Sequence, residues 1–259
     1  MIELQKVVVA YNDRVILDNV DLTIHDGETL AVLGGSGAGK STILRLIIGL
    51  QKPTSGHILV DGVDITKLSE DEFNKVRRKM GMVFQYSALF DSMSVGDNIA
   101  FGLKQHTDLD KHSIEQVVKR KLRMVGLPGT ERYMPSQLSG GMKKRISLAR
   151  AIALDPSIIL YDEPTSGLDP ITSGTISRLI RSMQKHLQCT SIVVTHDMQS
   201  AFFVADRVAL LDKGRFVEVS PTEEFRNSAN PKVQQFIHGR KSVKTRDTGE
   251  IVYEVDHGS

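Results

Sequence analysis

The sequence predicts an α/β fold built on a mainly parallel β-sheet. From residue 157 onward, apolar strand patterns alternate with helical patterns, which is typical of parallel strands joined by crossover helices. Residues 29–33 form a continuous apolar run that ends in glycines and is followed by a helical pattern. A run without polar alternation indicates a strand that is buried on both faces, as parallel sheets require.

The first 60 residues are predicted to consist mostly of strands. Strand patterns cover residues 2–9, 15–17 and 20–24, ahead of the buried run at 29–33. Residues 41–50 carry apolar side chains at helical spacing, and residues 57–60 return to a strand pattern before an Asp-Gly turn.

The pattern changes between about residue 92 and residue 155, where the chain is predicted to be mostly helical. Apolar residues at helical spacing mark one of its helices, namely Ile114, Val117, Val118, Leu122 and Val125. Strand patterns then resume at 157–161, 190–195 and 207–211, separated by helical patterns at 170–187 and 198–205. We therefore expect one domain over residues 1–238 in which a helical subdomain, about 92–155, is inserted.

Residues 239–259 are expected to form a separate C-terminal tail. The segment holds a loose basic stretch followed by alternating apolar residues at 251, 253 and 255. A solvated tail is the first interpretation, because chain termini are usually poorly ordered. The alternative is a tail that becomes ordered against a partner chain.

Composition excludes several classes of protein. The chain of 259 residues is 40% hydrophobic and 25% charged, as expected for a globular protein. Its formal net charge of +2 gives no indication of nucleic-acid binding. No apolar run approaches the roughly 18 residues of a spanning helix, and no signal-peptide pattern is seen, so any membrane role is expected to depend on a partner or on surface contact. The single cysteine, Cys189, is expected to be buried at the start of a strand.

A phosphate-binding loop is predicted directly after the strand at 29–33. The segment fits the pattern G-x-x-x-x-G-K-[ST] and precedes a predicted helix, which is the context this motif requires. Backbone N–H groups of the loop and of the helix N-terminus would bind phosphate, the lysine would reach the β- and γ-phosphates, and the hydroxyl of Ser41 would bind Mg²⁺. The residues expected to hold a nucleoside triphosphate are Gly34, Gly35, Ser36, Gly37, Ala38, Gly39, Lys40, Ser41 and Thr42.

Two further strands are predicted to end in catalytic side chains. The apolar run 158–161 is followed by Asp162 and Glu163, and the run 192–195 is followed by His196. Carboxyl ends of parallel strands face the ligand crevice. We expect Asp162 to hold Mg²⁺, Glu163 to activate the attacking water as a general base, and His196 to contact the γ-phosphate and orient that water.

The segment Leu138-Ser139-Gly140-Gly141-Met142 resembles the signature of ABC (ATP-binding cassette) ATPases, and the resemblance extends over residues 2–238. It implies a P-loop NTPase fold with an N-terminal antiparallel β subdomain, ATP and Mg²⁺ as ligands, and ATP hydrolysis as the activity. It also implies that two copies of the chain enclose two ATP molecules, with the signature of one copy against the γ-phosphate held by the other. The implied nucleotide contacts include Ser139, Gly140, Gly141, Asp169 of the D-loop, and Tyr11 stacked on adenine. Gln85 is the implied Q-loop residue, both catalytic and a Mg²⁺ ligand.

Three classes of ABC protein were compared with the sequence. Soluble ABC ATPases of DNA repair carry long coiled coils, and ribosome-acting ABC proteins usually carry two cassettes, whereas this chain shows one cassette and no heptads. The sequence therefore favours the ATP-binding subunit of a transporter.

The segment from Ala88 to Val95, next to the predicted Q-loop, resembles the ATPases of Mla-type, MCE-associated phospholipid transporters. This resemblance implies an integral permease, an MCE protein and a small STAS-domain protein as partners. It also implies a peripheral location at the cytoplasmic face of the bacterial inner membrane and a role in outer-membrane lipid asymmetry. A methionine-type amino-acid importer and the cell-division ABC ATPase remain as alternatives.

Overall fold

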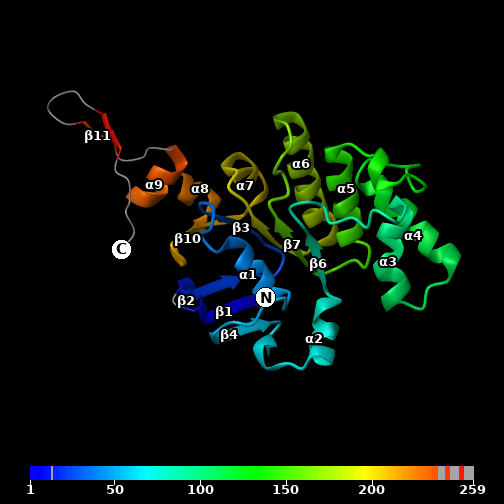
Figure 1. Ribbon diagram of the computed structural model, residues 1–259, viewed down its shortest axis with the longest axis horizontal. Helices are drawn as coiled ribbons and strands as arrows, with labels where there is room; N and C mark the ends of the chain where they lie inside the picture. Colours follow the sequence, from blue (N-terminus) through cyan, green and yellow to red (C-terminus); the bar gives the residue numbers. More distant parts are fainter. Residues whose placement is uncertain (13, 239–242, 246–250, 254–259) are drawn as a thin grey trace.

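The computed structural model describes residues 1–12, 14–238, 243–245 and 251–253. Its central sheet has the strand order β10-β9-β3-β8-β7-β6, and all neighbours are parallel except the edge strand β10, which runs antiparallel to β9. The α/β fold with a mainly parallel core sheet is confirmed (Figure 1). The strands are β3 (Thr29–Leu33), β6 (Met80–Val83), β7 (Ile158–Asp162), β8 (Thr190–Val194), β9 (Arg207–Asp212) and β10 (Arg215–Pro221).

A second sheet, of order β2-β1-β4-β5, is antiparallel throughout, as the resemblance implied. The two short strands predicted at 15–17 and 20–24 are one continuous strand, so this detail of the prediction is wrong. Asn19 lies within that strand and has a left-handed backbone (φ 52°). Because asparagine is polar and tolerates this conformation, the sequence pattern suggested that the strand was interrupted there. The strands are β1 (Ile2–Tyr11), β2 (Arg14–Ile24), β4 (Ser55–Val60) and β5 (Val63–Asp64).

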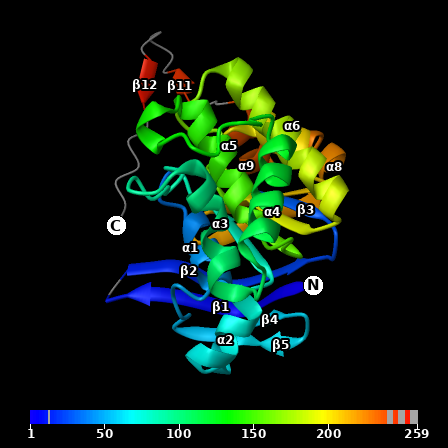
Figure 2. The same cartoon turned by 90° about the vertical axis from the view of Figure 1, so that its right-hand side faces the viewer.

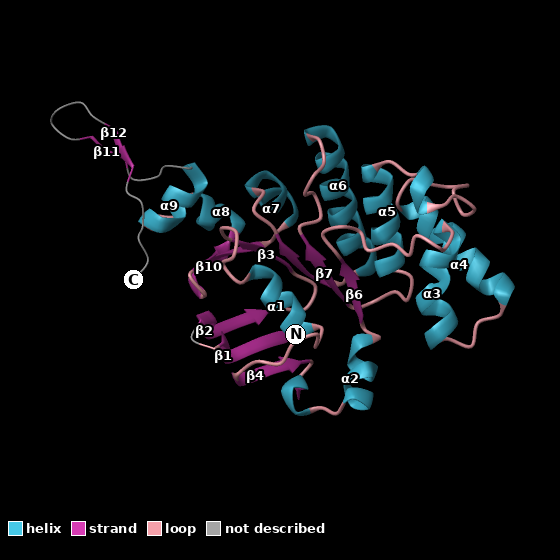
Figure 3. Cartoon of the chain, viewed as in Figure 1, coloured by secondary structure: helices cyan, strands magenta, loops and turns pink. Residues whose placement is uncertain are grey.

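Helix α1 (Lys40–Ile47) lies between the two sheets (Figure 3). Its apolar side chains join one core cluster with residues from both sheets, so the helix that follows the phosphate loop is held on two sides. The helix ends three residues earlier than the predicted 41–50. Gly49 has φ 69°, and the N–H groups of Gly49 and Leu50 donate to the carbonyls of Leu46 and Arg45. This Schellman pattern terminates the helix before Leu50, which is exposed.

The opposite face of the core sheet is covered by four helices, α3 to α6, which are called the helical block below (Figure 2). Strand β7 joins the two layers, because Ile158 and Leu160 belong to the α1 cluster while Ile159 and Tyr161 pack against the helices. The helices predicted for this region are present, and the expected apolar face of α4 is buried at Ile114, Val118 and Leu122. They are α3 (Val95–His106), α4 (Lys111–Met124), α5 (Gly140–Ala151) and α6 (Pro170–Leu187).

The remaining elements complete the edges of the molecule. Helices α7 (Met198–Val204), α8 (Thr222–Arg226) and α9 (Pro231–His238) bury apolar side chains against β3 and β9. The sequence patterns did not predict β10, α2 (Glu70–Arg77), α8 or α9. Strands β11 (Val243–Thr245) and β12 (Ile251–Tyr253) pair antiparallel, and the other residues of the predicted tail lie outside the described part of the chain. Cys189 is buried, as predicted.

Among the described residues, the structure has no helix with the length and apolar character that crossing a membrane requires.

Candidate nucleotide-binding and hydrolysis site

Three neighbouring strands of the core sheet end at one edge and bring the predicted motifs together. Val194 of β8 pairs with Val32 of β3 on one side and with Asp162 of β7 on the other. Because all three strands are parallel, the loops that follow them emerge at the same edge. The glycine-rich loop, the acidic pair and the histidine therefore lie within one site.

The glycine-rich loop ends at Gly39, which has φ 102° and precedes α1. A Cβ atom at this position would lie 2.9 Å from Cδ2 of Leu17, so both the backbone conformation and the space require glycine. No side chain caps α1, and the N–H groups of its first turn face the loop without an intrahelical partner. Such a helix start is suited to an anion.

Lys40 is buried at the centre of the site. Its ammonium donates to the carbonyl oxygens of Gly34 (2.8 Å) and Gly35 (2.9 Å), and it lies 4.0 Å from Oε1 of Glu163. Burial lowers the pKa of Lys40, and the nearby carboxylates of Glu163 and Asp162 act in the opposite direction. The lysine is thus held by two main-chain oxygens in a position from which it can reach a phosphate.

Ser41 and Asp162 form the second contact across the site. The Ser41 hydroxyl donates to Oδ1 of Asp162 at 2.8 Å, which places two hard oxygen atoms side by side, the donor type that Mg²⁺ prefers. Gln85, the third predicted metal ligand, follows β6. Its main-chain carbonyl accepts a hydrogen bond from Lys144, and its side chain makes no hydrogen bond to the described residues.

Glu163 has an unusual backbone and a well-defined side chain. Its φ of 46° is left-handed, a conformation rarely adopted by non-glycine residues and often found at functional sites. Oε2 of Glu163 lies 2.9 Å from Nδ1 of His196 and 3.1 Å from the hydroxyl of Thr195. The carboxylate is buried, whereas the His196 side chain is 65% exposed, so the pair opens to solvent at the imidazole.

The signature motif lies at the start of α5, in the helical block. The hydroxyl of Ser139 caps this helix by accepting from the N–H of Met142, and Gly140 and Gly141 form its first turn. A Cβ atom at Gly141 would lie 2.7 Å from Cγ2 of Thr172 in α6, so the turn packs closely on that helix. The predicted helix start at Ser139 is confirmed.

Two other predicted nucleotide contacts are placed by the structure. Asp169 caps α6 by accepting from the N–H groups of Ile171 and Thr172, both at 3.0 Å. Tyr11 lies at the end of β1 and is 56% exposed, so its side chain is not part of the core.

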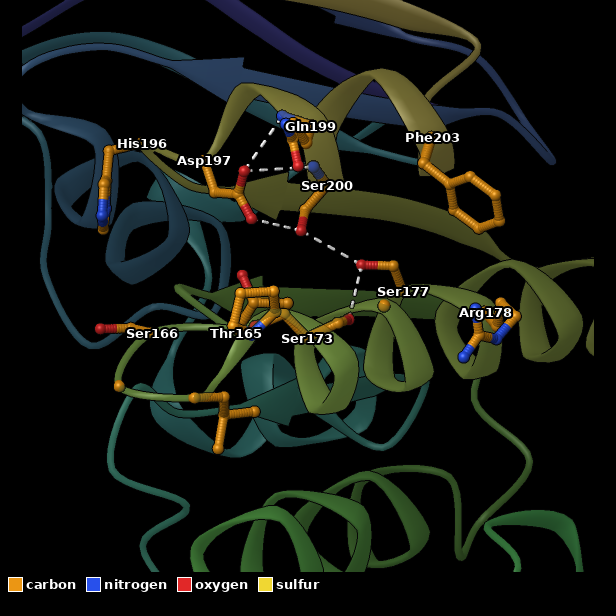
Figure 4. A pocket seen from close by; sticks show the side chains of 14 residues that line it. Thr165, Ser166, Ser173, Ser177, Arg178, His196, Asp197, Gln199, Ser200 and Phe203 are labelled. Carbon is orange, nitrogen blue, oxygen red and sulfur yellow. Dashed lines mark hydrogen bonds between the residues drawn. The ribbon is translucent and has the colours of Figure 1, made fainter.

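A cavity of about 490 Å³ lies beside the site, between the D-loop and the start of α7 (Figure 4). Its wall holds a line of polar contacts: the Ser177 hydroxyl lies 3.0 Å from Ser173 O and 3.2 Å from Ser200 Oγ, and the Ser200 hydroxyl donates to Asp197. His196 lies at one end of this cavity in Figure 4. These contacts therefore connect helix α6 to the loop that carries His196.

Sequence reasoning missed two residues that contact Glu163. Thr195 precedes the predicted histidine and binds the carboxylate, while Lys144 of α5 donates to the main-chain carbonyl of Glu163 at 3.3 Å. Lys144 shares helical spacing with Ser147 and Leu148, both buried, and this pattern could have indicated that the lysine is buried.

The comparisons with known proteins agree with this geometry. The ABC transporter family model matches residues 17–166. The chain is 43% identical over 95% of its length to the intermembrane phospholipid transport system ATP-binding protein MlaF of Haemophilus influenzae, covering 93% of that protein. The Escherichia coli K12 protein of the same name is 41% identical over 92% of this chain and 89% of its own length. The probable ribonucleotide transport ATP-binding protein mkl of Mycobacterium tuberculosis is 42% identical over 93% of this chain and 67% of its own length.

Solved structures give the same result. A dimeric ATP-binding cassette in a post-hydrolysis state, bound to ADP and Pi, superposes with a TM-score of 0.80 at 33% identity, covering 86% of this chain and 99% of its own. A Clostridium perfringens protein that is part of an ABC transporter complex superposes with a TM-score of 0.81 at 31% identity, covering 91% and 94% of the two chains. The chain belongs to the ABC transporter ATP-binding family, and it is an ATP hydrolase.

Proposed function

We propose that this chain powers phospholipid transport between membranes as the ATPase subunit of an Mla-type transporter. The observation that carries the hydrolytic part is the position of Glu163, between Lys40 on one side and His196 on the other. The transport part is supported by 41–43% identity over more than nine-tenths of the chain to two MlaF proteins.

The residues of the site divide into three roles. The glycine-rich loop from Gly34 to Thr42 binds the phosphates, and Tyr11 stacks on adenine. The oxygens of Ser41 and Asp162, together with Gln85, would hold Mg²⁺, which would neutralise charge on the β- and γ-phosphates when bound. Glu163 accepts the proton of the attacking water, and His196 orients Glu163 and contacts the γ-phosphate.

A second copy of the chain completes the site. The Ser139 turn begins a helix in the helical block, while the phosphate loop joins β3 of the core sheet to α1, so each motif belongs to a different subdomain. The free N–H groups at the start of α5 are suited to bind the γ-phosphate of an ATP molecule held by the partner chain. The D-loop with Asp169 would lie beside that contact. ATP would therefore favour a closed dimer, and hydrolysis would loosen it. The dimeric state of a structural relative supports this arrangement.

The permease is expected to bind beside the Q-loop. Tyr86 is 87% exposed there, and Phe90 and Phe101 form a partly exposed ring pair with centroids 5.0 Å apart. Ser87 and Ala88 have left-handed backbones, and their carbonyls accept from the guanidinium of Arg150. An exposed aromatic surface on a fixed loop suits an apolar helix of a membrane protein.

The wider assembly follows from the same proposal. The chain would lie peripherally at the cytoplasmic face of the inner membrane, bound to the permease, with an MCE protein and a small STAS-domain protein in the complex. The tail at 239–259, most of which lies outside the described residues, is the segment proposed to contact another chain. Deleting residues 240–259 should weaken assembly of the complex, and unchanged assembly and ATPase activity would contradict that part of the proposal.

The test is purification of the complex from detergent-solubilised membranes through a tag on this chain. An MCE protein and bound phospholipid in the complex would support the proposal. The competing candidate is ribonucleotide transport, because a relative of similar identity carries that description. Stimulation of ATPase activity by ribonucleotides, but not by phospholipid in reconstituted vesicles, would favour this candidate. A periplasmic solute-binding partner would indicate an amino-acid importer.

A further inference from the structure

Lys144 is a buried cation that the roles assigned above do not use. It lies on α5, five residues after Ser139, and its side chain is only 5% exposed. Its ammonium donates to the main-chain carbonyl of Gln85 and, at 3.3 Å, to the main-chain carbonyl of Glu163. One side chain of the signature helix therefore contacts both the Q-loop and the residue assigned as general base.

The contact with Glu163 matters because the backbone of Glu163 is strained. A non-glycine residue at φ 46° persists only where its surroundings hold it. The N–H of Glu163 donates to Val194 O at 2.8 Å, and its carbonyl accepts from the N–H of Ser166 at 3.2 Å as well as from Lys144. Lys144 is the side chain that holds this carbonyl from the helical block.

The ammonium also faces two acidic groups. Burial lowers the pKa of Lys144, while the carboxylates of Glu163 and Asp162 favour its charged form. Burying a lysine is unfavourable unless its charge is compensated, so an apolar residue would fit the same helix position at lower cost. The two carbonyl contacts of this buried lysine point to a role in the site.

The Q-loop side of the contact is equally well defined. Arg150, further along α5, donates to the carbonyls of Ser87 and Ala88, so Lys144 and Arg150 together bind the Q-loop backbone at both ends of the turn. Tyr86, one of the exposed aromatic residues proposed to contact the permease, lies on this same turn. A displacement of the turn would therefore be transmitted to α5 and, through Lys144, to Glu163.

We propose that Lys144 is a positioning residue for ATP hydrolysis: it fixes the main chain of Glu163 and links it to the Q-loop. The inference rests on the assignment of Glu163 as general base. Lys144 touches neither nucleotide-binding loop residues nor the carboxylate, so it acts through Glu163.

The test compares Lys144→Met with Lys144→Arg in the full-length protein. Methionine keeps an unbranched apolar stem but removes the ammonium, whereas arginine keeps a charge and donors for both carbonyls. We expect Lys144→Met to lower kcat for ATP about 10- to 100-fold, the range typical of a misplaced catalytic group. The KM for ATP should stay within about twofold, because the phosphate loop is intact. Lys144→Arg should recover most of the lost kcat.

Lys121→Met is the matched control. Lys121 is also buried, on α4, and pairs with Asp155 away from the site, so its loss should lower the midpoint of thermal unfolding while leaving kcat unchanged. Equal kcat values for Lys144→Met and Lys121→Met, or a loss confined to KM, would overturn the proposal. If Lys144→Met yields no folded protein, Lys144→Leu, which also has no donor for the two carbonyls, serves instead: reduced kcat at unchanged KM supports the proposal, and unchanged kcat overturns it.

Failure of the general-base assignment is a separate outcome. Rapid hydrolysis by Glu163→Gln would remove that assignment whatever Lys144 does. An inactive Glu163→Gln together with a fully active Lys144→Met would remove the role of Lys144 alone.

Discussion

Nδ1 of His196 lies 2.9 Å from Oε2 of Glu163, and the Thr195 hydroxyl donates to the same carboxylate oxygen at 3.1 Å. This contact sets the Nδ1 edge of the imidazole against the carboxylate. One oxygen of Glu163 is therefore fixed by its neighbours, and the other, Oε1, is on the side of Lys40. A carboxylate held in this way can accept a proton from water at a defined position.

Replacing Glu163 by glutamine tests this function. The amide keeps the shape of the side chain but is not a base, so kcat for ATP should fall about 10²- to 10⁴-fold. ATP affinity should change little, because the bonds from Lys40 to Gly34 and Gly35 do not involve Glu163. Single-turnover hydrolysis and equilibrium binding of ATP measure the two quantities separately. Turnover close to that of the unchanged protein would show that another group takes the proton.

Lys40→Ala should weaken ATP binding. The ammonium is held by two main-chain carbonyls next to the phosphate loop, and a hydrogen bond to a charged group contributes about 1.5–3 kcal/mol, which corresponds to roughly a 10- to 100-fold loss of affinity. Isothermal titration with ATP and Mg²⁺ measures this change. Lys52→Ala, at an exposed position, is the control and should bind as the unchanged protein does. Equal affinities for the two variants would contradict the role of Lys40.

The sequence was sufficient to predict the core of the fold. Strand β7 could be recognised because Ile158, Ile159, Leu160 and Tyr161 are all apolar, and the structure shows why: successive side chains enter two different core clusters. The end of α1 could not be predicted from apolar spacing, because Leu50 continues the pattern but the left-handed backbone of Gly49 ends the helix. Edge elements such as β10 lack a continuous apolar run and were missed for this reason.

The site was predicted where a motif fixes both residue type and local structure. The loop before α1 and the acidic pair at the end of β7 are of this kind, and a hydrogen bond between Ser41 and Asp162 joins them in the structure. The contacts of Lys144 could not be predicted, because they depend on how α5 packs against two loops that are distant in the sequence. A lysine within a helix gives no indication of which carbonyls it will meet.

Cys189 should be unreactive in the folded protein. Burial raises the pKa of its thiol, so the reactive thiolate is disfavoured, and the side chain is shielded from reagents. At pH 8 a disulfide reagent should react with the native protein at least about 10³-fold more slowly than with the guanidinium-unfolded protein, because reaction requires an opening of the core. The chain has one cysteine, so the signal is unambiguous. Rapid stoichiometric reaction of the native protein would show that this part of the core is open.

Ser139→Arg separates ATP binding from dimer closure. The phosphate loop of each chain is unchanged by this substitution, so binding of one ATP per chain should persist. The large side chain at the start of α5 would occupy the space proposed for the partner's γ-phosphate, and closure should be lost. The variant is best made in the Glu163→Gln background, where ATP persists, and the dimer is measured by light scattering with and without ATP.

Ser139→Ala is the matched control for this experiment. It removes the capping bond to the Met142 N–H, which costs about 0.5–2 kcal/mol of stability, but it adds no bulk at the turn. The alanine variant should therefore unfold at a lower temperature yet still form much of the ATP-dependent dimer, whereas the arginine variant should remain monomeric. If the arginine variant dimerises as fully as the alanine variant, the Ser139 turn does not face the nucleotide of the partner, and the shared site proposed for the two chains is wrong.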